Sequence, residues 1–332
     1  MKKKILFVYY QNIKQGGISK SISHLTKNLV DEGYDVTILF LVREHTDFFP
    51  IDIRVNKIYI DSFKTSHFKR AHNLNKKSFF KGKLRKFVNY SYDYGSYQVL
   101  KQWINENHHQ FDEIITCWYK LSTYLTYTEA APKTIAWEHI DHRVGGLVFL
   151  NLLRKRYSRL KGIIALTEES KIFYEKIHGN VFKISNIVGD QYENFEFNLA
   201  KKDNTILLAS RLDPEKNVKE FINIIKEVDL PKDWKVMIAG TGFIADEVQA
   251  HAERLKCDNI QFLGAIASEK MLELYTKSKI FCMTSLGEGL PTTLIEAIFC
   301  GNALVSYDCP TGPSEIVNEE NGFLVPLRDK QM

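Results

Sequence analysis

The stretch KILFVYYQNIKQGGISKSISHLTKNLVDEGYDVTILFLV, residues 4–42, contains a strand, a glycine turn, a helix and a second strand in succession. Residues 4–10 are an apolar run typical of a strand that is buried on both faces. Apolar residues then recur at helical spacing and predict an amphipathic helix that ends near Gly33. Residues 35–42 form the next apolar run. Two strands joined by a helix run parallel, so this stretch predicts an α/β fold with a doubly wound parallel sheet.

The remainder of the chain continues the alternation of strand and helix in two series. Strand-like runs lie at 112–118, 133–139 and 161–167 in the first series, and at 204–210, 234–240, 259–264, 279–285 and 302–308 in the second. Residues 189–203 are polar and lack strong periodicity, so we interpret them as a linker. The sequence therefore predicts two Rossmann-like domains, residues 1–188 and 204–332.

Composition limits the class of protein. A chain of 332 residues with 44% hydrophobic content can build two cores, and it contains no apolar run of membrane-spanning length. The apolar run near the start is short and lacks a small-residue cleavage site, so it is not interpreted as a signal peptide. The five cysteines show no CxxC spacing, which indicates reduced thiols and a cytoplasmic protein.

Positive charge is concentrated in one segment. Residues 64–86 contain nine Lys or Arg residues and no Asp or Glu, with aromatic residues between them. One interpretation is a solvated loop, and the other is a surface that meets anionic lipid or a pyrophosphate head group. Nucleic acid is a weaker option because no binding motif accompanies the charge. The residues predicted for a membrane or acceptor surface are Lys69, Arg70, Lys76, Lys77, Lys81 and Lys83.

Ligands of doubly wound sheets bind beyond the carboxyl ends of the strands. Gly16 and Gly17 lie between the first strand and its helix, where backbone N–H groups can approach a phosphate. A nicotinamide cofactor is disfavoured, because GxGxxG is missing from this turn and the second strand is followed by Arg43 and Glu44 without a ribose-binding signature.

The second series carries a similar motif in SRLDPEKN, residues 210–217. Arg211 and Lys216 flank a turn made by Asp213 and Pro214. This turn is either simply solvated or a pair of cations that clamps a diphosphate. The turn AGTG after the next strand offers a further close approach of backbone to a ligand.

The stretch EGLPTTLIEAIFCG, residues 288–301, combines two glutamates with a helix start. Pro291 suits the first turn of a helix, which places Glu288 in the preceding loop and Glu296 inside the helix. They would lie about 7–8 Å apart along the helix axis, a separation that suits two parts of one extended ligand. Carboxylates bind hydroxyl groups, so a ribose and a hexose are natural partners. The alternative is an exposed helix glutamate and a loop glutamate without function.

His139 in AWEHID ends a predicted strand of the first domain. An isolated histidine is more often a structural hydrogen-bonding group than a catalytic one. Its place at a strand end makes it a candidate for the site.

In this order and spacing, the motifs resemble those of the retaining glycosyltransferases of family four. The match comprises GGI near the start, EH, SRLDPEKN, AGTG, FLG and the two glutamates of an E-x7-E signature. The resemblance implies the GT-B fold, in which two Rossmann-like domains have parallel sheets that face each other across a cleft. The first would be the acceptor-side domain and the second the nucleotide-sugar-binding domain. Family members usually continue beyond NGFLVPLRDKQM, so the second domain is expected to be truncated at its C-terminus.

The resemblance also implies roles for individual residues. The donor-binding set would be Gly16, Gly17, Arg211, Lys216, Ile266, Glu288, Gly289, Leu290, Pro291, Thr292 and Glu296. Arg211 and Lys216 would neutralise the diphosphate, and Ile266 would contact the base. Glu288 would hold the donor sugar, and Glu296 the ribose. His139 and Glu288 are the predicted catalytic residues, and neither a metal nor another cofactor is expected.

The acceptor is suggested by DCPTGPSEIV, residues 308–317, which resembles a variant seen in bacterial polysaccharide and lipid-linked oligosaccharide transferases. The resemblance then implies transfer from UDP-hexose or UDP-N-acetylhexosamine to a glycan or polyprenyl-diphosphate acceptor. The enzyme would lie on the cytoplasmic face of the membrane as a peripheral protein. Two alternatives are a sugar-nucleotide epimerase of the same fold and a non-catalytic subunit that resembles a transferase.

Overall fold

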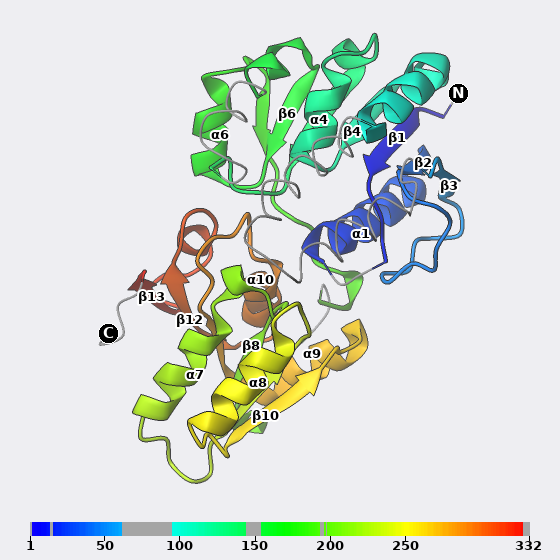
Figure 1. Ribbon diagram of the computed structural model, residues 1–332. Helices are drawn as coiled ribbons and strands as arrows, with labels where there is room; N and C mark the ends of the chain where they lie inside the picture. Colours follow the sequence, from blue (N-terminus) through cyan, green and yellow to red (C-terminus); the bar gives the residue numbers. More distant parts are fainter. Residues whose placement is uncertain are drawn as a thin grey trace, which may run out of the picture. The chain divides into compact units, whose positions relative to one another are not determined.

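The computed structural model describes residues 2–13, 16–61, 95–143, 154–192, 196 and 198–327. The chain divides into two compact units, Met1–Ile184 and Ser185–Met332 (Figure 1). Each unit contains one parallel sheet with helices packed against it, and each is described here by itself.

The first unit has a seven-stranded sheet in the order β3-β2-β1-β4-β5-β6-β7. Its strands are β1 (Lys4–Tyr9), β2 (Asp35–Phe40), β3 (Asn56–Tyr59), β4 (Glu113–Thr116), β5 (Thr134–Glu138), β6 (Gly162–Ala165) and β7 (Val181–Lys183). Every neighbouring pair is parallel. The chain moves outward from β1 to β3 and then returns to the other side of β1, so the strand order reverses between β1 and β4. Ligand sites of such sheets form at this reversal.

The helices of the first unit cover this sheet because their apolar faces are buried. They are α1 (Gly17–Asp31), a helical segment over 95–107, α4 (Tyr119–Leu125) and α6 (Glu168–Glu175), with short 3-10 turns at His108–Gln110, Ala131–Lys133 and Lys155–Arg159. Leu6 and Val8 of β1 pack with Leu100 and Ile104 of the helical segment and with Leu121 of α4 in one core cluster. The apolar run that predicted β1 is therefore buried as expected.

The second unit has a six-stranded parallel sheet in the order β10-β9-β8-β11-β12-β13. Its strands are β8 (Asp203–Ala209), β9 (Lys235–Ala239), β10 (Ile260–Gly264), β11 (Ser278–Met283), β12 (Ala303–Asp308) and β13 (Gly322–Pro326). Its helices are α7 (Val218–Glu227), α8 (Ala245–Arg254), α9 (Ser268–Lys277) and α10 (Thr292–Phe299), with 3-10 turns at Asp190–Tyr192, Leu199–Lys201, Pro214–Lys216 and Pro313–Glu315. The strand order reverses between β8 and β11, and the core contains two apolar clusters.

The predicted strands all occur, with ends that differ by one or two residues. Three further strands, β3, β7 and β13, were missed by the sequence analysis. Helix α1 ends at Asp31, and Gly33 follows it with a φ of +88°, in agreement with the predicted stop near this glycine. The stretch 189–203 contains two of the 3-10 turns and belongs to the second compact unit.

In the described part of the chain, no helix combines the length and the apolar character needed to cross a membrane. The five cysteines all lie in described residues, and none of them forms a disulfide.

Candidate active site

The loops that follow β8 and β11 meet at the carboxyl ends of these neighbouring strands. Nζ of Lys216, from the loop after β8, lies 2.6 Å from Oε1 of Glu288, from the loop after β11. Both side chains are mostly buried, with 15% and 13% of their surface exposed. The backbone N–H of Leu286 also donates to the carbonyl of Glu215 at 2.8 Å. The strand reversal between β8 and β11 thus brings two predicted donor-binding residues into contact.

Arg211 lies in the same loop as Lys216 and is half-exposed. Its guanidinium pairs with the carboxylate of Asp213 and, at 3.1 Å, with Oε1 of Glu215. Both carboxylates belong to the SRLDPEKN motif. The guanidinium is therefore held at the surface of the loop by two neighbours, and a diphosphate would have to compete with them.

The loop that carries Glu288 is held by residues 310–312. The hydroxyl of Thr311 donates to the carbonyl of Glu288, and the N–H of Glu288 points to the carbonyl of Pro310 at 3.4 Å. Gly312 has a φ of +91°, and a Cβ on it would come within 2.6 Å of the carbonyl oxygen of Gly289. The segment DCPTGP, which the sequence analysis linked to the acceptor, therefore supports the Glu288 loop.

Helix α10 begins directly after Pro291, with Thr292 as its first residue. In the described part of the chain, no side chain caps its first turn. Such a helix start presents unpaired backbone N–H groups and favours a negatively charged ligand. Leu290 before it is buried, and its carbonyl accepts a hydrogen bond from the side-chain amide of Asn186 at 3.3 Å. The helix begins next to the predicted position, with Pro291 as its N-cap residue and not in its first turn.

Glu296 in α10 is only 4% exposed. The hydroxyl groups of two buried tyrosines, Tyr192 and Tyr275, lie close to it: burial and then the Glu296 carboxylate raise the pKa of both. The alternative of an exposed helix glutamate is therefore wrong. The Glu296 carboxylate is buried next to Tyr192 and Tyr275. The sequence analysis did not predict these two tyrosines as its neighbours.

The turn AGTG has a structural reason for its glycines. A Cβ on Gly240, which has a φ of +135°, would lie 1.8 Å from the carbonyl oxygen of Ser210. A Cβ on Gly242 would meet the backbone of Leu212 at 2.4 Å. The turn therefore packs directly on the loop that carries Arg211. Ile266, after β10, is partly buried and packs against the neighbouring core cluster.

In the first unit, Gly16 precedes α1 and Gly17 is its first residue. Gly16 is extended, with a φ of −174°, and its carbonyl accepts from the N–H of Lys20 at 3.1 Å. Among the described residues, no side chain caps the first turn of α1, so its leading backbone N–H groups have the same character as those of α10. The structure thus places both glycines at a helix start, as the sequence analysis predicted.

His139 directly follows β5 and is 9% exposed. Burial lowers its pKa to about 3, so the imidazole is neutral at pH 7. Its ring centroid lies 4.1 Å from that of Trp137, and its Nε2 has no hydrogen-bond partner in the described part of the protein. The neutral imidazole therefore has one unpaired nitrogen, and that nitrogen is buried from solvent.

The residue before His139 carries a buried network that sequence reasoning missed. The carboxylate of Glu138 accepts hydrogen bonds from Tyr157 and Tyr174, and Arg154 lies beside it. These residues are far apart in the sequence and share no spacing motif. The only available signal was the charged residue at the end of an otherwise apolar strand, TIAWE.

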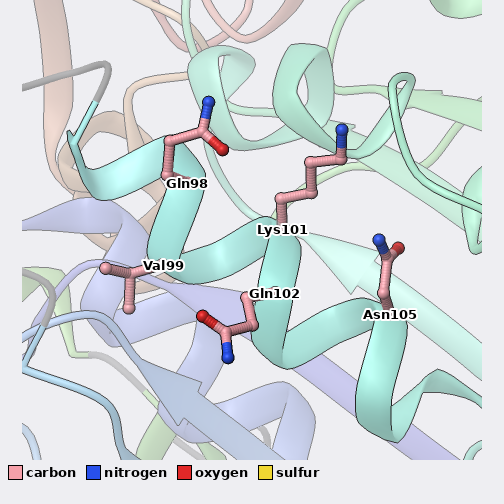
Figure 2. A pocket seen from close by; sticks show the side chains of 5 residues that line it. All are labelled: Gln98, Val99, Lys101, Gln102 and Asn105. Atoms are coloured by element: carbon pink, nitrogen blue, oxygen red, sulfur yellow. The ribbon is translucent and has the colours of Figure 1, made fainter.

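Two further regions bear on the predicted surfaces. The six basic residues predicted for a membrane or acceptor surface, between positions 69 and 83, lie outside the described residues. A solvent-open hollow of about 300 Å³ borders the helical segment over 95–107. Figure 2 shows its lining residues, Gln98, Val99, Lys101, Gln102 and Asn105, along that helix. None of them belongs to the predicted site.

Known structures define the fold of the chain. It superposes on the structure of the Staphylococcus aureus protein TarM, in complex with UDP and α-GlcNAc-glycerol, with a TM-score of 0.75. The match covers 99% of this chain and 90% of TarM at 14% identity. A sucrose-phosphate synthase from Thermosynechococcus elongatus matches with a TM-score of 0.76 over 99% of this chain and 87% of its own, at 12% identity. The chain therefore has the GT-B fold, and the predicted fold class of two Rossmann-like units with parallel sheets is confirmed.

The second unit also resembles a known family. Residues 190–332 match the family model described as glycosyl transferases group 1. The amylovoran biosynthesis glycosyltransferase AmsD of Erwinia amylovora is 26% identical over 99% of this chain and 87% of its own length. An undecaprenol-linked glycan α-1,4-N-acetyl-D-galactosaminyltransferase of Campylobacter jejuni is 29% identical over 54% of this chain and 50% of its own. The predicted resemblance is confirmed, and the epimerase alternative is not favoured.

Proposed function

We propose that this glycosyltransferase moves a hexose or N-acetylhexosamine from its UDP donor to a glycan or polyprenyl-diphosphate-linked acceptor, in bacterial surface polysaccharide synthesis. The transfer would retain the anomeric configuration and need no divalent metal. The proposal rests on the family of residues 190–332 and on the residues that meet at the ends of β8 and β11.

One observation carries the proposal: the 2.6 Å contact between Lys216 and Glu288. It brings together a cation, a carboxylate and the uncapped start of α10, all at the strand reversal of one sheet. A phosphate attracts the ammonium and the helix start, whereas a sugar hydroxyl suits the carboxylate. A sugar diphosphate needs both kinds of partner at adjoining positions.

The proposed chemistry breaks the bond between the anomeric carbon and the diphosphate oxygen. Lys216, Arg211 and the backbone N–H groups at the start of α10 would stabilise the negative charge on the departing diphosphate. The acceptor hydroxyl would bond to the anomeric carbon from the same face, and its proton would pass to the departing phosphate oxygen. Glu288 would hold the donor sugar and Glu296 the ribose hydroxyls. Neutral His139 would hydrogen-bond to the transferred sugar.

The acceptor class is proposed from the relatives. The Campylobacter jejuni protein acts on a diphospho-undecaprenol-linked glycan by its name, and the Erwinia protein belongs to amylovoran biosynthesis. A lipid-linked acceptor would require the enzyme to work at the cytoplasmic membrane surface. The basic residues between positions 64 and 86 would supply the contact with anionic lipid.

The donor is tested with UDP-glucose, UDP-galactose, UDP-GlcNAc, UDP-GalNAc and GDP-mannose. Thermal shift reports binding, and release of nucleotide reports turnover, each in the wild type and in Glu288→Ala. We expect one UDP-sugar to raise the melting temperature by several degrees and Glu288→Ala to reduce this shift. NMR of the product with undecaprenyl-diphosphate-linked glycans then gives the anomeric configuration.

The same assay separates the alternatives. An isomerised nucleotide sugar without release of UDP would support the epimerase instead. A folded protein that binds none of the donors would support the non-catalytic subunit. Activity that survives EDTA supports the metal-independent mechanism, and activity restored only by Mg²⁺ or Mn²⁺ would overturn it.

A further inference from the structure

A buried carboxylate closes strand β5 directly before His139. Oε1 of Glu138 accepts hydrogen bonds from the hydroxyls of Tyr157 at 2.8 Å and Ser122 at 3.3 Å. Its Oε2 accepts from the hydroxyl of Tyr174 at 2.9 Å. These donors come from α4, α6 and the 3-10 turn before β6. The end of β5 is therefore fastened to three separate elements.

Among the described residues, Arg154 is the cation that pairs with Glu138, and both side chains are buried. Arg154 is 1% exposed, and its Nη2 lies 3.7 Å from Oε2 of Glu138. Its Nη1 donates to the carbonyl of His142 at 2.5 Å. The guanidinium thus contacts both ends of the stretch 138–142. We refer to residues 139–143 as the β5 loop.

Inside the β5 loop, Asp141 is also buried. Its carboxylate accepts from the backbone N–H of Arg143 at 2.8 Å and from Nε of the same residue at 3.0 Å. The ring of His142 stacks on Phe173 of α6, with centroids 4.1 Å apart. The loop that begins with His139 is consequently fixed along its length.

Stability alone gives a weak reason for such a cluster. Burying a carboxylate and a guanidinium removes both from water, and apolar residues of similar volume often stabilise a core equally well. Among the described residues, Nε and Nη2 of Arg154 have no hydrogen-bond partner, so the described part of the network leaves two buried donors unsatisfied. A buried pair that joins a strand end to its loop instead defines one geometry for that loop.

We infer that Glu138 and Arg154 are positioning residues that hold His139 in the orientation needed for sugar transfer. This inference rests on the proposed function, because it takes His139 as the group beside the transferred sugar. Displacing a catalytic group by about 1 Å can lower the rate by about 100-fold. Loss of either residue should therefore lower kcat and leave the affinity for UDP unchanged, since the proposed UDP contacts lie mostly in the second unit.

The variants are Glu138→Gln, Arg154→Lys and Tyr174→Phe, with Glu113→Gln as the matched control. Glu113 is a second buried glutamate of the same sheet, but it lies at the start of β4, where it pairs with Lys3 and Lys161. Tyr174→Phe removes one hydrogen bond to Glu138 and keeps the ring, so it serves if the charge variants unfold. Thermal melting establishes which variants are folded.

Three measurements follow: kcat and KM for the donor, the Kd of UDP, and the side-chain ¹H–¹⁵N NMR signals of His139. We expect kcat to fall about 10- to 100-fold in Glu138→Gln and Arg154→Lys. We expect KM and Kd to change less than twofold and the His139 signals to shift. Glu113→Gln should alter none of the three.

Unchanged kcat in folded Glu138→Gln and Arg154→Lys would overturn the inference. An equal loss in Glu113→Gln would also overturn it, because general destabilisation would then explain the effect. If the wild type turns over no donor, the proposed function fails, and the NMR signals still test whether the network orients His139. Signals that stay in place in every folded variant would then reject the positioning role.

Discussion

The ammonium of Lys216 lies 2.6 Å from Oε1 of Glu288, although 72 residues separate the two in the sequence. Both side chains are largely buried, and each neutralises the charge of the other. In the free protein, the cation proposed for the diphosphate and the carboxylate proposed for the sugar are thus held as one pair. Binding of a donor would replace this contact with contacts to the ligand.

A double-mutant cycle measures the pair. Lys216→Met leaves the Glu288 carboxylate buried without a cation, and we expect the free energy of unfolding to decrease by about 1–3 kcal/mol. Lys216→Met combined with Glu288→Gln removes both charges and should recover more than half of this loss. Urea unfolding of the full chain gives the four values. A double variant as unstable as the sum of the single variants would show that the two side chains do not interact.

Arg211 should matter for the ligand more than for the fold. Its partners Asp213 and Glu215 form an ion-pair network with a half-exposed guanidinium, and such pairs contribute about 0–1 kcal/mol to stability. Arg211→Ala should leave the melting temperature nearly unchanged. A charge-assisted hydrogen bond to a phosphate contributes about 1.5 kcal/mol, so we expect the Kd of UDP to rise about 10-fold.

Calorimetry with UMP provides the comparison for Arg211. If the guanidinium binds the outer phosphate of the diphosphate, Arg211→Ala should change the Kd of UMP less than twofold. Equal losses for UDP and UMP would instead place Arg211 elsewhere on the ligand.

The sequence predicted the central strands because they carry long apolar runs, as in KILFVY of β1 and DVTILF of β2. The missed strands β3, β7 and β13 all lie at sheet edges. Edge strands are covered on fewer sides, so they tolerate short and mixed sequences such as VFK in β7. Local patterns carry little information about them.

For the candidate site, too, the sequence predicted the local features and missed the contacts between distant residues. Glu288, Pro291 and Glu296 lie within one short stretch, and their relation to helix α10 follows from local rules for helix starts. The contact between Lys216 and Glu288 depends instead on which strands are neighbours in the sheet. The tyrosines beside Glu296 and the arginine beside Glu138 depend on tertiary packing, for which no spacing rule exists.

Gly312 should be required for the geometry of the Glu288 loop. Alanine there would adopt an unfavourable positive φ and bring its Cβ within 2.6 Å of the carbonyl oxygen of Gly289 and of Cδ of Pro291. We expect Gly312→Ala to destabilise the protein by about 1–3 kcal/mol and to weaken UDP binding, because the loop must shift.

Gly287→Ala is the matched control for Gly312→Ala. Gly287 precedes Glu288 in the loop that Gly312 packs against, and a Cβ on Gly287 would meet no described atom within 4 Å. Differential scanning calorimetry should show a lowered melting temperature for Gly312→Ala only. Equal melting temperatures for both variants would mean that the loop accommodates a side chain at position 312.

His139 should make the stability of the protein depend on pH. Burial lowers its pKa to about 3 from the ordinary value of 6.5, so between these pH values the unfolded chain binds a proton that the folded chain does not. This contribution to stability is complete above pH 6.5 and is lost as the pH falls toward 3. The loss approaches about 4 kcal/mol at the lower end. In His139→Gln, the free energy of unfolding should therefore fall less steeply over this range than in the wild type.

The same neutral ring predicts the pH profile of catalysis. Because His139 is uncharged throughout the range from pH 5 to 9, its titration should produce no decrease of kcat near pH 6.5.

Urea unfolding at pH 4.5, 5.5, 6.5 and 7.5 tests the stability effect, with the exposed His109→Gln as the control. Two results would contradict the neutral imidazole. One is a decrease of kcat below pH 6.5 that disappears in His139→Gln. The other is an equal pH dependence of the free energy of unfolding in the wild type and in His139→Gln.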